Sequence, residues 1–520
     1  MKKIKLYDYQ QKMLEDIINV LTTAATGRFY DENGKKEKVG SSVMVQMPTG
    51  TGKTYVMAAV VKWFLDNHDT GEVWIVAHRR ELVEQMQQTL DRFCLDYGEK
   101  EMELKAKVRI RVLSIQWLNI HIDELEGAGC TAGLIVVDEA HHAIATSYQD
   151  LFGRYRKALK LGMTATPCRM NKNSFSKLFE RLIVSPCTND FIMRGYLAPY
   201  DYVVIGKFSQ DQLTVNQLKG RGSDGDYAIK EMDEKLNIPQ TIQRLYDSVK
   251  KYADGKKGIV YAIDIVHAQA IAACYNALGI KSVALDSKTP AKKRKEMVEA
   301  FRRSEIDCMV NVNLFDEGFD CPDVEFIQMA RPTLSLAKYL QMVGRGLRIN
   351  HKNNDKVCMI IDNVGNYRKF GLPDKPRNWE SMFAGLRVGK GIIPTYVKKL
   401  QSIIAVNDEL IVVKKANTAR KKMTVQQLDE YLKNVEPFQQ DSRWGLKVKD
   451  DIIVKPIYSH ISNFRGDYAE CRIGMQKCLY GLLDRRGNII LPPEYKYIYK
   501  WNDHEAEVEG SNGYCRTIEL

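Results

Sequence analysis

The sequence predicts an α/β protein in which two doubly wound parallel-sheet domains in tandem precede a small all-β repeat module. Short apolar runs rich in Val and Ile alternate with segments of helical period through the first two-thirds of the 520 residues. The alternation pauses in a polar, Gly-rich stretch at residues 206–226 and then resumes. From about residue 441, short apolar runs are broken by Gly, Asn, Asp and Pro. Because buried parallel strands are joined by crossover helices, the first pattern predicts two βα domains, and the last predicts antiparallel strands.

The expected strands follow the apolar runs in chain order. In the first domain they are residues 41–47, 72–77, 109–114 and 133–138. In the second domain they are residues 258–263, 282–286, 307–313, 325–330 and 357–362. The boundaries that follow are 1–190 for the first domain, 191–235 for a connecting excursion, 236–370 for the second domain, 371–440 for a basic and helical linker, and 441–520 for the β module.

The β module repeats itself. A Trp-Gly pair at Trp444 and a Tyr-Gly pair at Tyr480 stand 36 residues apart in similar surroundings, with a third fragment near Gly513. Upstream, residues 411–422 form a basic connector, and a capping box predicts that a helix starts at Thr424.

Composition excludes several classes of protein. The formal net charge of +12 permits a polyanionic partner such as nucleic acid. No apolar run approaches the roughly 20 residues of a membrane span, and the N-terminus reaches Asp8 before the apolar core of a signal peptide can form. The 11 cysteines are scattered without a CxxC pair. We therefore expect a cytoplasmic protein with reduced thiols, no membrane contact and no zinc site.

A phosphate-binding loop (P-loop) is predicted at residues 47–54, MPTGTGKT, between an expected strand and an expected helix. Glycines let successive backbone N–H groups close around phosphate oxygens. Lys53 would reach the β and γ phosphates of ATP, and the Thr54 hydroxyl would hold Mg²⁺. The strict pattern begins with Gly where this chain has Met47, and the alternative is an ordinary Gly-rich turn. The residues expected to contact ATP here are Thr49, Gly50, Thr51, Gly52, Lys53 and Thr54.

An acidic pair stands at the carboxyl end of the expected strand 133–138, in GLIVVDEAHH. Ligands of open α/β sheets bind at that edge. We expect Asp138 to take Mg²⁺ and Glu139 to orient or deprotonate the attacking water. The alternative is a solvated turn, which the P-loop upstream makes the weaker interpretation.

With these motifs the chain resembles the DEAH-type superfamily 2 helicases over about residues 6–370, with a core similar to that of the RadD-like group. The resemblance is carried by LYDYQQ, VAHRREL, LGMTATPCR, NVNLFDEGFDCP and QMVGRGLR, which stand in the family's order. It implies that both domains are RecA-like, that Gln10 reads adenine, and that Gly318 and Asp320 join the ATP site and bridge it to nucleic acid. Gln341 would contact the γ-phosphate or couple the sites. The other residues to which the resemblance gives a coupling role are His141, Thr164 and Thr166.

Two arginines of QMVGRGLR are expected to act at the γ-phosphate. Arg345 and Arg348 are three residues apart and therefore share one face of a helix. From the second domain they would stabilise transition-state charge as arginine fingers, so catalysis would need the cleft between the domains to close. The alternative is a salt-bridged helix face. The expected catalytic set is Lys53, Asp138, Glu139, Gln341, Arg345 and Arg348.

Nucleic-acid contacts are less residue-specific, because such motors hold a strand mainly by its phosphates. Arg79 and Arg80 in VAHRREL are candidates, with a plain helix-start surface as the alternative. The basic segment 291–303 carries an apolar stripe that ends at Phe301, so we interpret its lysines as the solvated face of a helix.

The C-terminal module resembles WG repeats, small β units taken as interaction modules, and this implies a protein partner. Asp484 with Glu494 and Lys496 imitates a nuclease signature. We reject that interpretation because Pro492 and Pro493 precede the glutamate and the segment lies inside the repeat.

We therefore expect an ATP-dependent, Mg²⁺-using helicase or translocase that acts on DNA rather than RNA. One alternative is a duplex-DNA motor subunit of a restriction or phage-defence assembly. Another is a nucleotide-gated nucleic-acid clamp or scaffold without processive motion. Strand separation and translocation along duplex are both compatible with these motifs.

Overall fold

The fold was taken from a computed structural model of the chain. Contacts divide the chain into two compact units, Met1–Val388 with Ile404–Lys422, and Gly389–Ile403 with Met423–Leu520. The first unit contains two large sheets, and the second contains the β module. The residues that the structure describes are 5–23, 28–30, 36–78, 80–93, 95, 97, 108–143, 146–168, 174–285, 289–312, 321–350, 352–353, 355–385, 410–414, 430–440, 442–449, 451–473, 479–485, 487, 489–502, 505–510 and 515–519.

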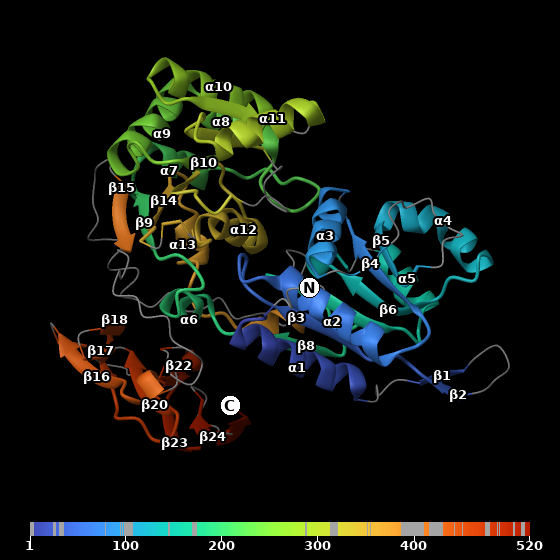
Figure 1. Cartoon of the computed structure of the whole chain (residues 1–520). Helices are drawn as coiled ribbons and strands as arrows, with labels where there is room; N and C mark the ends of the chain where they lie inside the picture. The colour runs from blue at the N-terminus through green and yellow to red at the C-terminus, as the bar shows by residue number, and fades with distance from the viewer. Residues whose placement is uncertain are drawn as a thin grey trace. The chain divides into compact units, whose positions relative to one another are not determined.

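The first sheet has six parallel strands in the order β5-β4-β6-β7-β3-β8 (Figure 1). The four expected strands are confirmed, and β7 and β8 are additional. Its strands are β3 (Ser42–Gln46), β4 (Glu72–Ala77), β5 (Ile110–Ser114), β6 (Ala132–Val137), β7 (Leu159–Thr164) and β8 (Arg181–Val184). The helices of this region are α1 (Asp8–Thr22), α2 (Lys53–Asn67), α3 (Arg80–Arg92), α4 (Ile115–Gly127), α5 (Thr146–Arg154) and α6 (Thr188–Met193), and a hairpin joins β1 (Arg28–Tyr30) to β2 (Lys36–Lys38).

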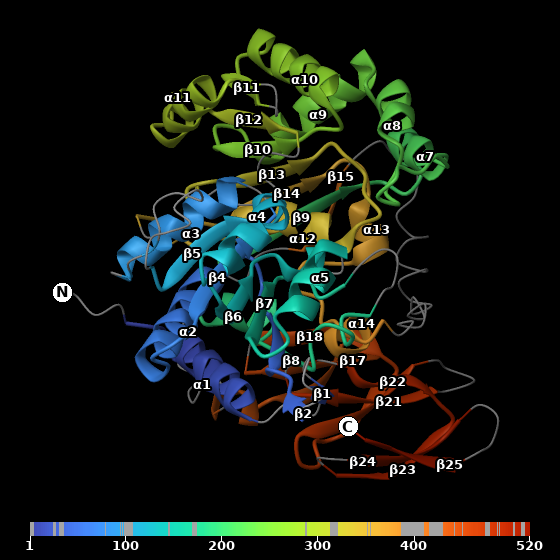
Figure 2. The same ribbon diagram turned by 90° about the vertical axis from the view of Figure 1, so that its right-hand side faces the viewer.

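Both faces of the first sheet are covered, because successive side chains of a strand point to opposite sides. Val43 and Val45 belong to a core shared with α1, α2 and α3. Met44 and Trp74 face the other way, into a core with α4 and α5. Figure 2 shows α1 and α2 side by side, as their contacts require. Burial on both faces explains why these strands are continuous apolar runs in the sequence.

The second sheet has seven strands in the order β11-β12-β10-β13-β14-β9-β15, all parallel except β15 (Figure 2). All five expected strands are confirmed. The strands are β9 (Tyr200–Ile205), β10 (Gly258–Tyr261), β11 (Ser282–Leu285), β12 (Cys308–Asn311), β13 (Phe326–Met329), β14 (Cys358–Asp362) and β15 (Leu410–Lys414). The helices are α7 (Gln210–Asn216), α8 (Ile229–Leu236), α9 (Pro239–Tyr252), α10 (Ile265–Ala277), α11 (Ala291–Arg302), α12 (Leu336–Gly346), α13 (Asn366–Phe370) and α14 (Trp379–Phe383).

The segment 191–235 is more than the connection that we expected, because it supplies β9, the strand next to the edge strand β15 of the second sheet. β9 pairs with β14 on one side and with β15 on the other. Tyr200 and Tyr202 are fully buried in this strand. Their hydroxyls donate to Asp374 (2.5 Å) and Asp362 (3.1 Å). These partners satisfy the two phenol hydroxyls, which would otherwise be buried without a hydrogen bond.

The expected linker 371–440 also contributes to the first unit. It supplies β15, and α14 buries Phe383 in the core on the α4–α5 face of the first sheet. The Phe383 carbonyl accepts a hydrogen bond from the backbone N–H of Phe175 (2.9 Å). The helix start expected at Thr424 lies outside the described residues.

The β module consists of three antiparallel sheets, β16-β17-β18, β19-β20-β21-β22 and β23-β24-β25. Trp444 pairs with Tyr458, and Tyr480 pairs with Tyr495, so the two copies of the repeat form corresponding hairpins. Gly513 lies outside the described residues. The strands are β16 (Glu436–Gln440), β17 (Arg443–Val448), β18 (Asp451–Tyr458), β19 (His460–Ile461), β20 (Tyr468–Ile473), β21 (Leu479–Asp484), β22 (Ile489–Tyr495), β23 (Tyr497–Trp501), β24 (Glu505–Glu509) and β25 (Cys515–Glu519).

Within the described part of the chain, no helix has both the length and the apolar character that a bilayer crossing requires.

Candidate active site

The P-loop follows β3 and leads into α2, as the sequence predicts. Gly50 (φ +87°) and Gly52 (φ +78°) adopt the left-handed conformation that favours glycine. A Cβ at Gly52 would lie 2.4 Å from Nε2 of Gln10, and a Cβ at Gly50 would lie 3.2 Å from Cδ2 of Leu197. The loop therefore needs glycine at both positions, for its backbone path and for the space around it.

Gln10 lies against the P-loop. It occupies the first turn of α1, where its Oε1 accepts a hydrogen bond from the backbone N–H of Tyr7 (3.0 Å). Its Nε2 makes a long hydrogen bond to the carbonyl of Thr51 (3.4 Å). The hydroxyl of Tyr9 donates to the same carbonyl (2.8 Å). The start of α1 thus joins the P-loop through side chains, although 41 residues separate Gln10 from Thr51.

The acidic pair Asp138 and Glu139 follows β6 directly, at the carboxyl edge of the first sheet. Glu139 has φ +46°, an uncommon conformation for a residue with a side chain. Its Oε2 lies 3.2 Å from Nδ1 of His141, which is also 3.2 Å from the hydroxyl oxygen of Thr164. The backbone N–H of Thr166 donates to that hydroxyl oxygen (3.1 Å). A continuous polar path therefore joins the DEAH segment to the end of β7.

Helix α12 brings the second sheet's residues to the P-loop. Ser335 caps its first turn by accepting from the N–H of Lys338 (3.3 Å). Gln341 and Arg345 lie on its buried face. A Cβ at Gly344 would lie only 2.6 Å from Cβ of Thr49, so the helix backbone touches the loop.

Four charged side chains, two from the DEAH segment and two from QMVGRGLR, act on Lys53. Burial lowers the pKa of this ammonium, and the guanidiniums of Arg345 and Arg348 lower it further. The carboxylates of Glu139 and Asp138 act in the opposite direction. The geometry agrees for one of the arginines, because a Cβ at Gly50 of the P-loop would lie 3.3 Å from Cγ of Arg348. A site that combines a buried lysine, two carboxylates and two guanidiniums can bind a polyphosphate. It can also stabilise the negative charge that develops on the phosphate oxygens during hydrolysis.

Several expected site residues are not placed. Gly318, Asp320 and Arg79 lie outside the described residues. Arg80 begins α3, but its side chain is outside the described part.

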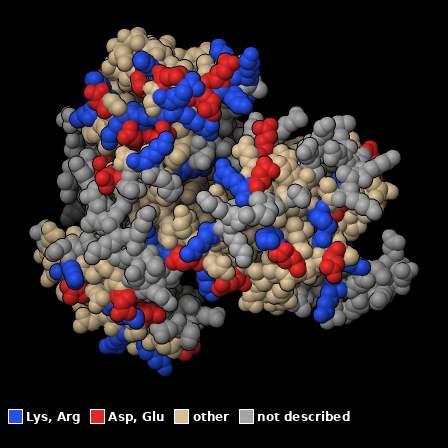
Figure 3. Space-filling model, in the orientation of Figure 1, with Lys and Arg blue, Asp and Glu red and all other residues tan. Residues whose placement is uncertain are grey.

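The basic segment 291–303 forms α11, as expected. Phe301 is fully buried, whereas Lys292 and Lys293 are exposed. Figure 3 shows basic side chains gathered with acidic ones over the part of the molecule that contains this helix. The lysines of α11 thus occupy a solvated face, and their mixture with acids marks no separate basic track there.

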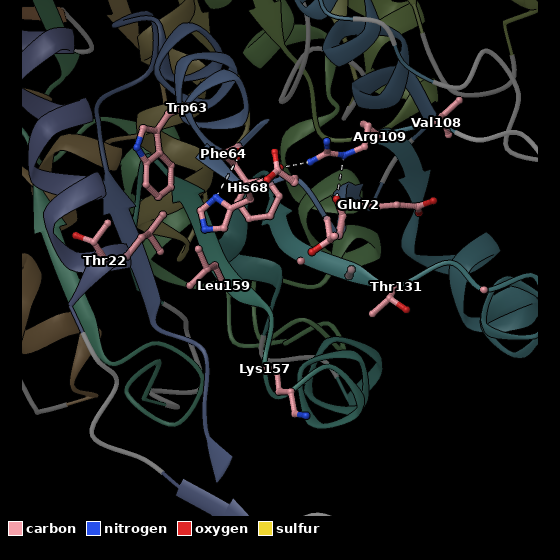
Figure 4. Close-up of a pocket in the computed structure, with 17 residues that line it drawn as sticks. Thr22, Trp63, Phe64, His68, Glu72, Val108, Arg109, Thr131, Lys157 and Leu159 are labelled. Carbon is pink, nitrogen blue, oxygen red and sulfur yellow. Dashed lines mark hydrogen bonds between the residues drawn. The ribbon is translucent and has the colours of Figure 1, made fainter. Parts of the chain in front are cut away.

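A pocket of about 990 Å³ lies away from these residues (Figure 4). Its lining includes Glu72, Ala132 and Leu159, the first residues of β4, β6 and β7, so it opens at the amino edge of the first sheet. Arg109 donates there to the carbonyls of His68 (2.6 Å) and Gly71 (3.2 Å). The P-loop and the acidic pair occupy the opposite, carboxyl edge, which is where open α/β sheets bind ligands.

Three family models match this chain. Residues 3–169 match "Type III restriction enzyme, res subunit", residues 239–350 match "Helicase conserved C-terminal domain", and residues 480–503 match "WG containing repeat". The chain is 33% identical over 345 residues to a 51.5 kDa protein of Lactococcus phage (isolate 7-9), which covers 66% of this chain and 70% of that protein. The chain belongs to superfamily 2 of the helicases.

Two further relatives of this superfamily 2 chain carry functional names. One is the Saccharomyces cerevisiae protein provisionally named ATP-dependent helicase IRC3, 25% identical over 382 residues, 69% of this chain and 51% of that protein. The other is the Sulfurisphaera tokodaii DNA 3'-5' translocase XPB2, 24% identical over 372 residues, 64% of this chain and 80% of that protein. The chain thus spans about half the length of the yeast relative. The narrower RadD-like grouping stays a prediction.

The superfamily 2 motifs account for most of the site, but sequence reasoning missed the residues that support it. Tyr9 holds the P-loop carbonyl of Thr51, and Leu197 lies against Gly50. Arg194 is 1% exposed and pairs with Asp8. No local pattern marks Arg194 or Leu197, because their partners are far away in the sequence.

Proposed function

We propose that this superfamily 2 protein is an ATP-driven motor that moves along or unwinds nucleic acid, with DNA as its track. The observation that carries the proposal is the close contact of α12 and Arg348 with Thr49 and Gly50 of the P-loop, next to a buried lysine on which the charges of Asp138, Glu139, Arg345 and Arg348 act. An ordinary Gly-rich turn would not collect a buried lysine together with both carboxylates and both arginines.

Nucleotide binding follows from the P-loop and the start of α1. Backbone N–H groups of residues 49–54 would surround the phosphates, and Lys53 would pair with the β and γ phosphates. Arrival of a polyphosphate would favour the charged form of Lys53, whose pKa is lowered in the free protein. Gln10 lies beside Gly52, at the side of the loop where the base would lie.

Asp138 and Thr54 fit Mg²⁺ because both offer the oxygen ligands that this ion prefers. Asp138 is nearly buried at the end of β6, and Thr54 lies in the first turn of α2. When bound, Mg²⁺ would neutralise charge on the phosphate oxygens.

For hydrolysis, Glu139 would orient the attacking water and accept its proton, with His141 holding the carboxylate in place. Arg345 and Arg348 would stabilise the charge that develops on the transferred phosphoryl group. They belong to the second sheet's region, whereas Lys53 and Glu139 belong to the first. Loss of the γ-phosphate would therefore weaken the attraction between the two regions, and movement would follow.

Coupling to nucleic acid would run through the polar path from Glu139 to Thr166. His141 and Thr164 connect the acidic pair to the segment after β7. A shift at the γ-phosphate would thereby reach the segment after β7. DNA is favoured as the track because the Sulfurisphaera relative is named a DNA translocase, and the chain covers 80% of that relative.

A second candidate is a duplex-DNA motor that serves a nuclease or another enzyme on a separate chain. The match of residues 3–169 to a restriction-enzyme subunit family favours it, as does the WG-type module, which could dock a partner.

Steady-state ATP hydrolysis tests the proposal, with no nucleic acid, single-stranded DNA, duplex DNA or RNA at fixed salt, because phosphate contacts are salt-dependent. Glu139→Gln is the inactive variant, and we expect it to lose about 10²-fold or more in kcat. Glu124→Gln, on the exposed side of α4, is the matched control and should keep full activity.

Strong stimulation by DNA that Glu139→Gln abolishes would support the motor, and stimulation by duplex alone would favour the second candidate. A single burst of turnover, without sustained stimulation by any polymer, would replace the motor with the nucleotide-gated clamp.

A further inference from the structure

A short strap of five residues, 194–198, touches three parts of the proposed ATP site. It lies between α6 and β9, where the chain passes from the first sheet to the second. Leu197 packs against Gly50 of the P-loop. The N–H of Ala198 donates to the carbonyl of Leu347, the residue before Arg348 (2.7 Å).

The strap is anchored to the start of α1 by a buried guanidinium. Arg194 pairs with the carboxylate of Asp8. It also stacks on the rings of Tyr9 (5.8 Å to the ring centre) and Tyr196 (4.9 Å). The hydroxyl of Tyr196 donates to Asp8 as well (3.0 Å). A guanidinium that is 1% exposed is costly to bury, so its planar contacts hold Asp8 and Tyr9 in one arrangement.

The Gln10 amide adjoins that arrangement, because the Tyr9 hydroxyl donates to the same Thr51 carbonyl that Gln10 contacts. The amide oxygen accepts from the N–H of Tyr7, and the amide nitrogen donates to the carbonyl of Thr51. A flipped amide would place donor against donor and acceptor against acceptor, so only one orientation is satisfied. One lone pair of Oε1 and one hydrogen of Nε2 remain for a ligand, so the position of the free acceptor and that of the free donor are both fixed.

We propose that Arg194 and Tyr196 are positioning residues for selection of the nucleotide base, which they perform by keeping the Gln10 amide in this orientation. Adenine presents a donor, its 6-amino group, beside an acceptor, N7, and an amide held this way complements both. Guanine presents two acceptors, O6 and N7, so its O6 would face Oε1 without a hydrogen. The inference rests on the proposed ATP site and on the adenine-reading role that the resemblance gives to Gln10, and it adds the part that Arg194 and Tyr196 play in that reading.

The test compares the Kd values of fluorescent mant-ATP and mant-GTP for the full-length protein, without hydrolysis. We expect the wild-type protein to bind mant-ATP at least about tenfold more tightly. Arg194→Met should narrow this ratio to about twofold or less. Arg194→Lys, which keeps the charge but lacks the planar fork, should restore part of it. Tyr196→Phe, which removes only the hydroxyl, should narrow it to an intermediate value.

Asn189→Ala on α6 is the matched control, because the Asn189 side chain donates a hydrogen bond to the sulfur of Met193 (3.5 Å) rather than to Asp8. It should leave the ratio unchanged. The inference is overturned if the wild-type protein binds both nucleotides equally. It is also overturned if the Arg194 and Tyr196 variants keep the wild-type ratio, even with a lower unfolding temperature. Binding is measured without turnover, so the two tests are independent. Absence of DNA-stimulated hydrolysis would refute the motor, and the ratio of the two Kd values would still test the role of Arg194 and Tyr196.

Discussion

Buried polar side chains in this protein are held in defined protonation states by their surroundings. His267, in the first turn of α10, is fully buried, and its Nδ1 accepts from the N–H of Ile263 (3.3 Å). Burial lowers its pKa to about 4, against an ordinary value of 6.5, and Asp264 opposes the shift only partly. The ring is therefore neutral in the folded protein at pH 5, whereas it is charged in the unfolded chain.

This difference predicts a pH-dependent stability. Between pH 6.5 and 4 the unfolded chain binds more protons at His267, so the free energy of unfolding falls as the pH falls through that window. His267→Asn keeps a side-chain acceptor for the N–H of Ile263 but removes the basic imidazole. It should reduce the loss of stability between pH 7 and pH 5 by about 2 kcal/mol, measured by urea unfolding. His121→Asn on α4 serves as the control, and an equal effect in both variants would contradict the assignment.

At the scale of the element, the contact between α12 and the P-loop sets the geometry of the site. Gly344 allows the helix backbone to touch Thr49. Arg345 follows within α12, but the helix ends at Gly346, so the expectation that Arg345 and Arg348 share one helix face is wrong and Arg348 lies just beyond the helix end. The position of the arginines therefore depends on how closely this helix approaches.

Gly344→Ala tests that dependence. The added Cβ would lie 2.6 Å from Cβ of Thr49, so α12 must move away from the loop. A shift of about 1 Å can cost on the order of 10²-fold in rate, so we expect kcat for ATP to fall about 10- to 100-fold. Gly153→Ala in α5, where an added Cβ meets nothing within 4 Å, is the control. Unchanged kcat in Gly344→Ala would show that the observed approach is not needed for catalysis.

At the scale of the whole molecule, the chain separates into a motor unit and a β module. All charged groups of the proposed site lie in the unit formed by Met1–Val388 and Ile404–Lys422. The strands of the other unit pair only among themselves in the described part of the chain.

This separation predicts that a chain shortened by removal of residues 423–520 keeps the ATPase kcat of the full protein within about twofold. Stimulation by DNA should persist too, if the module serves only to dock a partner. Steady-state hydrolysis with and without DNA measures both quantities. Normal basal turnover with lost stimulation would assign a DNA contact to the module instead.

The strands that the sequence predicted correctly are those marked by a run of consecutive apolar residues. Residues 73–77 and 258–263 are uninterrupted apolar runs because both faces of the sheet are covered. β7 escaped prediction because it contains Lys160 and Gly162. Lys160 is buried and donates to the carbonyl of Ala158 (2.8 Å). β8 is an edge strand with exposed ends, and its short apolar centre carries a weak signal.

The ATP motifs were readable in the sequence because a phosphate loop needs glycines and a lysine at fixed spacing, and a strand end needs its carboxylates next to it. Those requirements are met within a few residues. The family resemblance implied that Arg345 and Arg348 act at the γ-phosphate, but only the tertiary structure showed that α12 touches the P-loop at Gly344 and that Arg194 holds Asp8 across 186 residues. Contacts of that range depend on which helix packs against which loop, and apolar periodicity shows that a face is buried without showing what covers it.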